Sequence, residues 1–158
     1  MRVDEIMTRT IHSCSPQDTL EGAAQIMWEH DCGCVPVCEG SGSRRVIGTI
    51  TDRDICMSAL FRGKPLREIA VSDAMAREVQ SCRAEDSLAQ AEKAMRNGQI
   101  RRVPVIDDQG SLIGMLSLAD IAREAAREQT RPRREVTEVE VNETLAAICN
   151  PSRQSLNA

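Results

Sequence analysis

The sequence predicts an α/β (α+β) fold built from two copies of one β-α-β-β-α unit. The first observation is an internal repeat, because residues 3–55 and 69–121 carry the same pattern. The second is the order of hydrophobic periodicities in each copy, where strand-like and helix-like segments alternate. The third is the length of a copy, since about 50 residues cannot bury an adequate core alone. We therefore expect the two copies to pack on each other with pseudo-two-fold symmetry.

The repeat is defined by matched residues at two successive shifts. A shift of 68 aligns the pairs Val3/Val71, Met7/Met75, Cys14/Cys82, Leu20/Leu88, Ala23/Ala91, Met27/Met95, Val35/Val103 and Val37/Val105. After a two-residue deletion in the second copy the shift becomes 66, and it aligns Gly48/Gly114, Thr51/Ser117, Asp54/Asp120 and Ile55/Ile121. The predicted organisation is a first repeat at 1–62, a second repeat at 69–129 and a C-terminal extension at 130–158.

In the first copy, apolar residues recur at helical spacing from Leu20 to Met27. Asp18 or Thr19 is expected to cap this helix, because a short side-chain oxygen accepts hydrogen bonds from the unpaired amides of the first turn. The other expected elements are an extended stretch at 11–14, strands at 34–38 and 46–51 joined by a hairpin tip at 39–43, and a helix from residue 52.

The second copy repeats this order before the pattern breaks. Its expected elements are strand 79–82, helix 87–97, strand 103–106, turn 107–110, strand 112–117 and helix 118–129. Beyond it, residues 136–141 are expected to add a short edge strand, and residues 143–149 place apolar side chains on one helical face. The last residues, 150–158, are expected to form a flexible end.

Composition excludes several classes of function. The net charge of −4 and pI near 5.3 disfavour nucleic acid as a partner, because its backbone selects basic surfaces. The sequence holds no run of 18 apolar residues, so no membrane partner is expected, and it lacks a basic-then-apolar leader. Seven cysteines then indicate buried thiols in a reducing compartment, and we expect a cytoplasmic protein.

The strongest candidate for chemistry is a stretch that occurs once in each copy, at residues 48–54 and 114–120. Each stretch places a hydroxyl, Thr51 or Ser117, at a strand-to-helix junction and an aspartate, Asp54 or Asp120, one helical turn later. A helix start attracts phosphate, and a carboxylate accepts from two adjacent sugar hydroxyls, so the pair is typical of a nucleotide site. The alternative is that the hydroxyls are N-caps and the aspartates only complement the helix start.

The doubled Val-Pro-Val strand and the repeated Gly-x-x-Thr/Ser-x-x-Asp motif resemble a tandem pair of cystathionine β-synthase (CBS) domains, the Bateman module. Thr51–Ile55, Ile100–Val105 and Ala147–Pro151 resemble small stand-alone bacterial two-CBS proteins of the hypoxic-response type. This resemblance implies a non-catalytic regulatory homodimer that binds an adenine nucleotide (AMP, ADP or ATP) in the cleft between the repeats.

The resemblance also assigns roles to individual residues. It implies that Asp54 and Asp120 hold ribose, that Thr51 and Ser117 hold phosphate, and that Arg101 and Arg102 neutralise phosphate with help from Arg53. The backbone that would clasp adenine belongs to Ile11, His12, Val35, Pro36 and Val37 in the first copy, and to Val79, Val103, Pro104 and Val105 in the second. The first copy has Gly33 and Cys34 where the second has the arginine pair, so its site carries less charge or borrows an arginine.

Other signals are weaker. A zinc site at His30, Cys32, Cys34 and Cys38 is disfavoured. If residues 34–38 form a strand, Cys34 and Cys38 lie about 13 Å apart along it, which is too far for both sulfurs to bind one zinc ion. Neither a catalytic triad nor a phosphate-binding loop is visible, and the basic run that includes Arg123 and Arg127 is interleaved with glutamates, as in a solvated helix face. The alternatives left open are a ligand-free dimeric interaction module, acting on an unidentified protein partner, and a thiol redox sensor.

Overall fold

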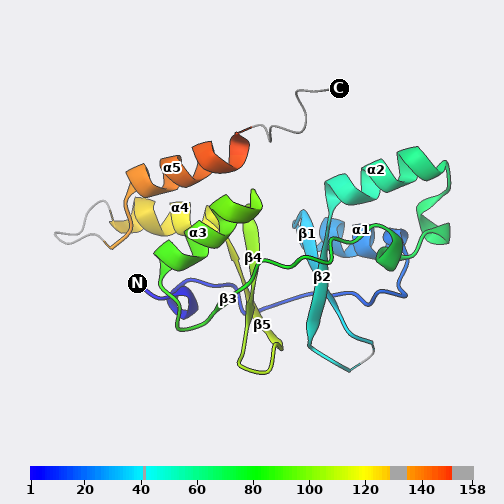
Figure 1. Cartoon of the computed structure of the whole chain (residues 1–158), viewed down its shortest axis with the longest axis horizontal. Helices are drawn as coiled ribbons and strands as arrows, with labels where there is room; N and C mark the ends of the chain where they lie inside the picture. Colours follow the sequence, from blue (N-terminus) through cyan, green and yellow to red (C-terminus); the bar gives the residue numbers. More distant parts are fainter. Residues whose placement is uncertain (41, 129–134, 151–158) are drawn as a thin grey trace. The chain divides into compact units, whose positions relative to one another are not determined.

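The chain folds into a mixed α/β structure, as predicted (Figure 1). The computed structural model describes residues 1–40, 42–128 and 135–150. The helices are α1 (Leu20–Glu29), α2 (Asp52–Arg62), α3 (Leu88–Gly98), α4 (Leu118–Glu128) and α5 (Glu138–Cys149). The strands are β1 (Cys34–Cys38), β2 (Val46–Thr51), β3 (Cys82–Arg83), β4 (Arg102–Ile106) and β5 (Leu112–Ser117), and short 3-10 turns occupy η1 (Val3–Glu5), η2 (Leu66–Glu68) and η3 (Val71–Asp73).

Two compact units make up the chain, and each contains a segment from the other copy of the repeat. Unit 1 comprises Met1–Arg9, Gln80–Val105 and Gly114–Ala158, and unit 2 comprises Thr10–Val79 and Ile106–Ile113. The N-terminal stretch of each copy, which we call its leading segment (residues 3–8 and 71–76), therefore belongs with the sheet of the other copy. The boundaries of the repeats themselves stay a prediction, as does the packing of the copies.

Unit 2 is built on an antiparallel β1–β2 hairpin in which Val35 pairs with Ile50. Helix α1 packs against β1, and α2 packs against β2 and α1. Thr19 caps α1, because its Oγ1 accepts from the amide of Gly22 at 3.2 Å. The leading segment of the second copy pairs with β2 through reciprocal hydrogen bonds between Ala76 and Thr49, at 2.9 and 3.0 Å.

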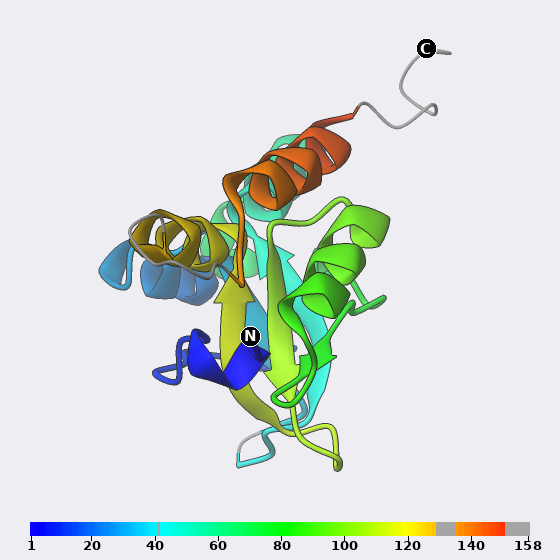
Figure 2. The ribbon, with the colours of Figure 1, turned by 90° about the vertical axis from the view of Figure 1, so that its left-hand side faces the viewer.

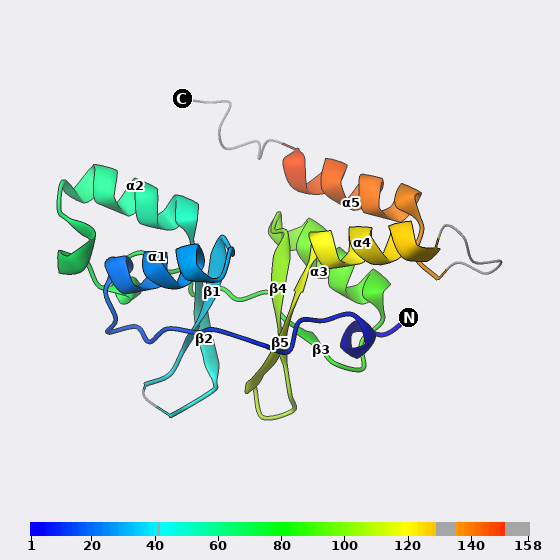
Figure 3. The same cartoon turned by 180° about the vertical axis from the view of Figure 1, so that it is seen from behind.

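Unit 1 contains β3, all of β4 except Ile106, β5 from Gly114 onward, and the remaining three α-helices. The leading segment of the first copy pairs with β5 through reciprocal 2.9 Å bonds between Thr8 and Met115, and Figure 3 shows this blue segment beside β5. Helix α5 lies on α3 and α4 (Figure 2). Thr144 of α5 is fully buried, accepts from Arg96 Nη1 at 2.8 Å and donates to Glu92 Oε1 at 3.3 Å.

The residues that define the repeat form the cores of both units. Val3 and Val71 are fully buried, as are Ala23 and Ala91. The same holds, at 8% exposure or less, for the pairs Met7/Met75, Cys14/Cys82, Leu20/Leu88, Met27/Met95, Val35/Val103, Val37/Val105, Ile50/Leu116 and Ile55/Ile121. The repeat is therefore a pattern of core packing, supplied by aliphatic side chains, methionine and cysteine.

Some predicted elements were wrong or too long. Residues 136–141 form no edge strand, because α5 begins at Glu138. Thr137 caps it: its Oγ1 accepts from the amide of Glu140 at 3.3 Å, and the Glu140 carboxylate accepts from the amide of Thr137 at 2.9 Å. The stretches 11–14 and 79–82 are mostly irregular, with one isolated bridge at Cys14 and a strand that starts only at Cys82.

All but the first residue of the predicted flexible end, 150–158, lies outside the described residues, as does the predicted last residue of the 118–129 helix. Within the described ranges, none of the helices combines the length and the apolar character needed to cross a bilayer.

Candidate functional site

The first candidate site begins where β2 passes into α2. Thr51 ends the strand and caps the helix, and its Oγ1 accepts from the amide of Asp54 at 3.2 Å. Asp54 returns the contact, because its Oδ2 accepts from the amide and the hydroxyl of Thr51 at 2.9 and 2.6 Å. Within the part of the chain that the structure describes, no protein group donates a hydrogen bond to the other oxygen, Oδ1.

The second candidate site repeats this arrangement where β5 passes into α4. Asp120 Oδ2 accepts from the amide and the hydroxyl of Ser117 at 2.8 and 2.6 Å, and Ser117 Oγ accepts from the amide of Asp120 at 3.1 Å. The capping interpretation is therefore confirmed in both copies. Capping uses one carboxylate oxygen in each case, so it orients the aspartate side chain and leaves the second oxygen outside the cap.

The glycine of each motif lets a leading segment approach the strand. A Cβ on Gly48 would lie 2.8 Å from the carbonyl oxygen of Ala76, and one on Gly114 would lie 2.5 Å from Met7 Sδ. Both glycines lie three residues before a capping hydroxyl, so the leading segment runs past the same strand that ends in the site. The motif glycine is a packing requirement here, rather than part of a phosphate-binding loop.

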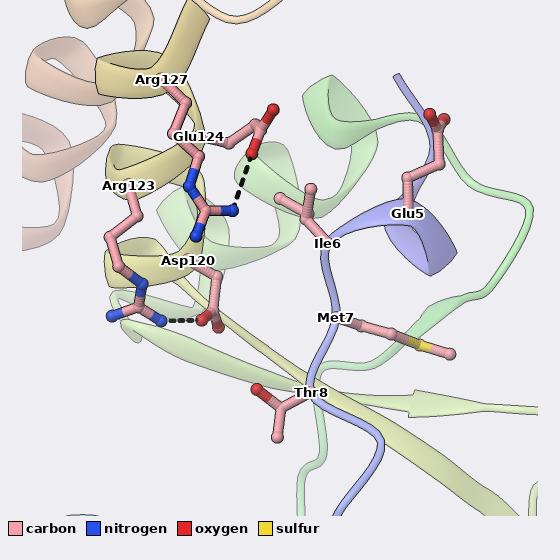
Figure 4. A pocket seen from close by; sticks show the side chains of 8 residues that line it. All are labelled: Glu5, Ile6, Met7, Thr8, Asp120, Arg123, Glu124 and Arg127. Carbon is pink, nitrogen blue, oxygen red and sulfur yellow. Dashed lines mark hydrogen bonds and ion pairs between the residues drawn. The ribbon is translucent and has the colours of Figure 1, made fainter.

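A hollow of about 300 Å³ lies beside Asp120 in unit 1 (Figure 4). The leading segment forms one wall and α4 the other, and the lining residues are Glu5, Ile6, Met7, Thr8, Asp120, Arg123, Glu124 and Arg127. Asp120 is 9% exposed and pairs with Arg123, and Arg127 pairs with Glu124 at 3.5 Å. Sequence reasoning placed Arg123 and Arg127 on a solvated helix face. Their spacing of three and seven residues from Asp120 was the signal that puts all three on one face of α4.

The other predicted site residues differ in how far they are exposed to solvent. Val35, Pro36 and Val37 of β1 and Val103, Pro104 and Val105 of β4 are buried, so their side chains belong to the core and only their backbone is suited to contact a ligand. Ile11, His12 and Val79 are half-buried, and the His12 ring stacks on His30 with centroids 3.3 Å apart. Arg53, Arg101 and Arg102 are exposed, and none of them lines the hollow.

The cysteines of the core are protonated thiols. Burial raises the pKa of Cys14 and of Cys82 to about 12, and burial also raises the pKa of Cys38. A thiol reacts with oxidants mainly as its thiolate, so these residues are poorly suited to redox sensing. Among the residues that the structure describes, no three or more histidine, cysteine or acidic side chains gather as metal ligands.

The family model for the CBS domain matches residues 3–60 and 71–127. The chain belongs to the CBS-domain family. Two CBS domains in tandem confirm the predicted resemblance, and sequence relatives support it. The CBS domain-containing protein YhcV of Bacillus subtilis is 35% identical over 120 residues, which are 76% of this chain and 82% of the relative. Hypoxic response protein 1 of Mycobacterium tuberculosis is 31% identical over 147 residues, which are 93% of each chain.

Solved CBS structures share the fold of this CBS pair. The crystal structure of Hypoxic Response Protein I with two coordinated zinc ions has a TM-score of 0.70 at 32% identity, covering 78% of this chain and 98% of that one. CBSX2 in complex with AMP has a TM-score of 0.67 at 23% identity, covering 80% and 96%. The CBS domain pair of protein MJ0100, in complex with 5′-methylthioadenosine and S-adenosyl-L-methionine, has a TM-score of 0.72 at 22% identity, covering 82% and 98%.

Proposed function

We propose that this CBS pair is a non-catalytic regulatory module that binds an adenine nucleotide of the AMP, ADP or ATP class at Asp54 and at Asp120. The observation that carries the proposal is the doubled site geometry. Each copy ends a strand in a hydroxyl that caps the next helix, and fixes an aspartate 2.6 Å from that hydroxyl. The solved CBS pairs that hold AMP, or 5′-methylthioadenosine and S-adenosyl-L-methionine, support an adenosine-containing ligand.

Each part of such a ligand has a chemical counterpart in the proposed sites. The ribose diol would donate to the aspartate, since a carboxylate accepts two neighbouring hydroxyls. The phosphate would lie at the start of α2 or α4, near Thr51 or Ser117, where the positive end of the helix dipole favours negative charge. Adenine would lie against the backbone of β1 or β4, and we propose that the exposed Arg53, Arg101 and Arg102 neutralise the phosphate.

Signal output requires that the ligand binds one arrangement of the protein better than another. We propose that the protein is a cytoplasmic homodimer formed through its CBS repeats, and that nucleotide binding shifts the dimer or its contact with a protein partner. CBS pairs are generally regulatory modules, so the proposal assigns no reaction to the site.

A ligand-free interaction module is the second candidate, and a specific observation favours it. Trp28 on α1 and Phe61 on α2 are 88% and 80% exposed. They are the one tryptophan and the one phenylalanine of the sequence, so neither large aromatic side chain is used in the core. Exposed aromatic side chains are typical of protein interfaces. An interface and a nucleotide site are compatible, so the decisive question is whether the nucleotide binds.

Calorimetric titration with AMP, ADP, ATP and their 2′-deoxy analogues tests the proposal. We expect the ribonucleotides to bind at least about tenfold more tightly, because loss of the 2′-hydroxyl leaves a carboxylate under-paired. Asp54→Asn and Asp120→Asn should each remove one site, whereas Asp52→Asn, at an exposed carboxylate of the same helix start, should leave binding unchanged. Equal binding of the ribo and deoxy forms would contradict the role of the aspartates. If millimolar nucleotide does not raise the melting temperature of the protein, the ligand-free interaction module is favoured.

A further inference from the structure

The two aspartates differ in what occupies their second carboxylate oxygen. Asp120 Oδ2 is taken by the cap at Ser117, and Oδ1 accepts from Nη2 of Arg123, one helical turn further along α4 (Figure 4). At the equivalent place in the first copy, Met57 follows Asp54 by three residues. Methionine has no donor, and Oδ1 of Asp54 accepts no hydrogen bond within the described ranges.

This difference changes what a ligand must do to reach each aspartate. At Asp54 a sugar diol meets an open oxygen. At Asp120 one of the two acceptor sites of Oδ1 already holds Arg123, so a diol that donates both of its hydroxyls to Oδ1 must displace that guanidinium. The displacement is feasible, because the Arg123 side chain is 64% exposed while that of Asp120 is 10% exposed, and half-exposed ion pairs are weak.

A displaced guanidinium needs another anion to remain well paired. Of the other two carboxylates that line the hollow, Glu124 is already paired with Arg127, and Glu5 accepts a hydrogen bond from the amide of Arg2. A phosphate on the same ligand supplies that anion in bidentate geometry. The phosphate in turn needs Arg123, because it would otherwise face the carboxylates of Glu5 and Glu124 in the same hollow.

We infer that Arg123 is a specificity-determining residue, which makes the Asp120 site selective for phosphorylated adenosine, whereas the Asp54 site with Met57 accepts the ribose without requiring a phosphate. This inference rests on the proposed nucleotide function and assigns a different ligand class to each site. The next turn of each helix shows the same difference between the copies, because the second copy has Arg127 where the first has Phe61.

The test uses each site in isolation, with AMP and adenosine as the probes. Asp54→Asn leaves the Asp120 site, and AMP should bind it at least about tenfold more tightly than adenosine. Adding Arg123→Met, which copies the first repeat, should weaken AMP and strengthen adenosine, so that their affinities approach each other. Lys93→Met removes one exposed charge from the same unit and should leave the AMP-to-adenosine ratio unchanged.

The reciprocal variant makes the test independent of how Arg123→Met folds. In an Asp120→Asn background only the Asp54 site remains, and Met57→Arg should lower its affinity for adenosine and raise its preference for AMP. If AMP binds but neither substitution changes the ratio, the role of Arg123 is overturned while the proposed function stands. If neither AMP nor adenosine binds the wild-type protein, both the inference and the proposed function are overturned.

Discussion

Replacing Gly48 by alanine should destabilise the protein more than the same replacement at Gly114. The two glycines are equivalent in the repeat, and each lets a leading segment approach its strand. At Gly48 the nearest atom to an added Cβ is the backbone oxygen of Ala76, at 2.8 Å. At Gly114 it is Met7 Sδ, at 2.5 Å, the end of a flexible side chain.

The loss of stability in each variant depends on how easily the atoms that face the added Cβ can move away. Ordinary contact begins near 3.4 Å, so the Ala76 carbonyl must retreat by about 0.6 Å. That carbonyl accepts from the amide of Thr49 at 3.0 Å, and its retreat stretches this hydrogen bond. Overpacking of this kind costs about 1–3 kcal/mol, offset by about 0.4–1 kcal/mol from the reduced freedom of the unfolded chain. Met7 can change rotamer, so Gly114→Ala should cost below about 1 kcal/mol.

Urea denaturation of the wild type and both variants measures this difference. The unfolding midpoint should fall clearly for Gly48→Ala and little for Gly114→Ala, with the slope m unchanged in both. An equal loss in the two variants, or a larger loss at Gly114, would refute the argument that a backbone contact, rather than the nearest distance, sets the cost.

Further predictions concern α5 and the thiols. Thr144→Val should lower the free energy of unfolding by about 1–3 kcal/mol in urea denaturation, because it leaves buried polar partners unpaired. Burial raises the pKa of Glu92, so this carboxyl holds more protons in the folded than in the unfolded state, and its contribution to stability is fully present below the unfolded pKa of about 4.3 and is lost as pH rises through the folded value. Glu92→Gln should remove this loss, seen as a flatter profile of melting temperature against pH, and a profile as steep as the wild type's would contradict it. Iodoacetamide at neutral pH should modify exposed Cys56 well before Cys14 or Cys82, as checked by peptide mass spectrometry.

The repeat predicted much of the fold because it records core packing. Leu20 and Leu88, or Ile55 and Ile121, keep their apolar character in both copies since each fills the same place in its unit. Helix boundaries also followed from local chemistry, as with the cap at Thr19. These features depend on residues close in sequence, so one chain was enough to find them.

The C-terminal extension was predicted less well because competing local signals had to be weighed. Val136, Val139 and Val141 favour a strand by composition. The cap at Thr137, with Glu140 three residues later, outweighed them and started α5 at Glu138. The apolar side chains of this segment then became helix positions instead of strand positions. Recognition of the capping box was the step that would have given the helix.

The sequence pattern located the aspartates but missed the arginines beside one of them. A search for repeated motifs rewards what the two copies share, which here is the cap and the carboxylate. Arg123 and Met57 were passed over because they differ, yet both follow an identical cap by the same spacing. In a duplicated protein the shared residues maintain the fold and the basic site, whereas unmatched neighbours of a matched residue can give each site its own chemistry. A single arginine that occupies one carboxylate oxygen would be enough to make two sites of common origin respond to different ligands.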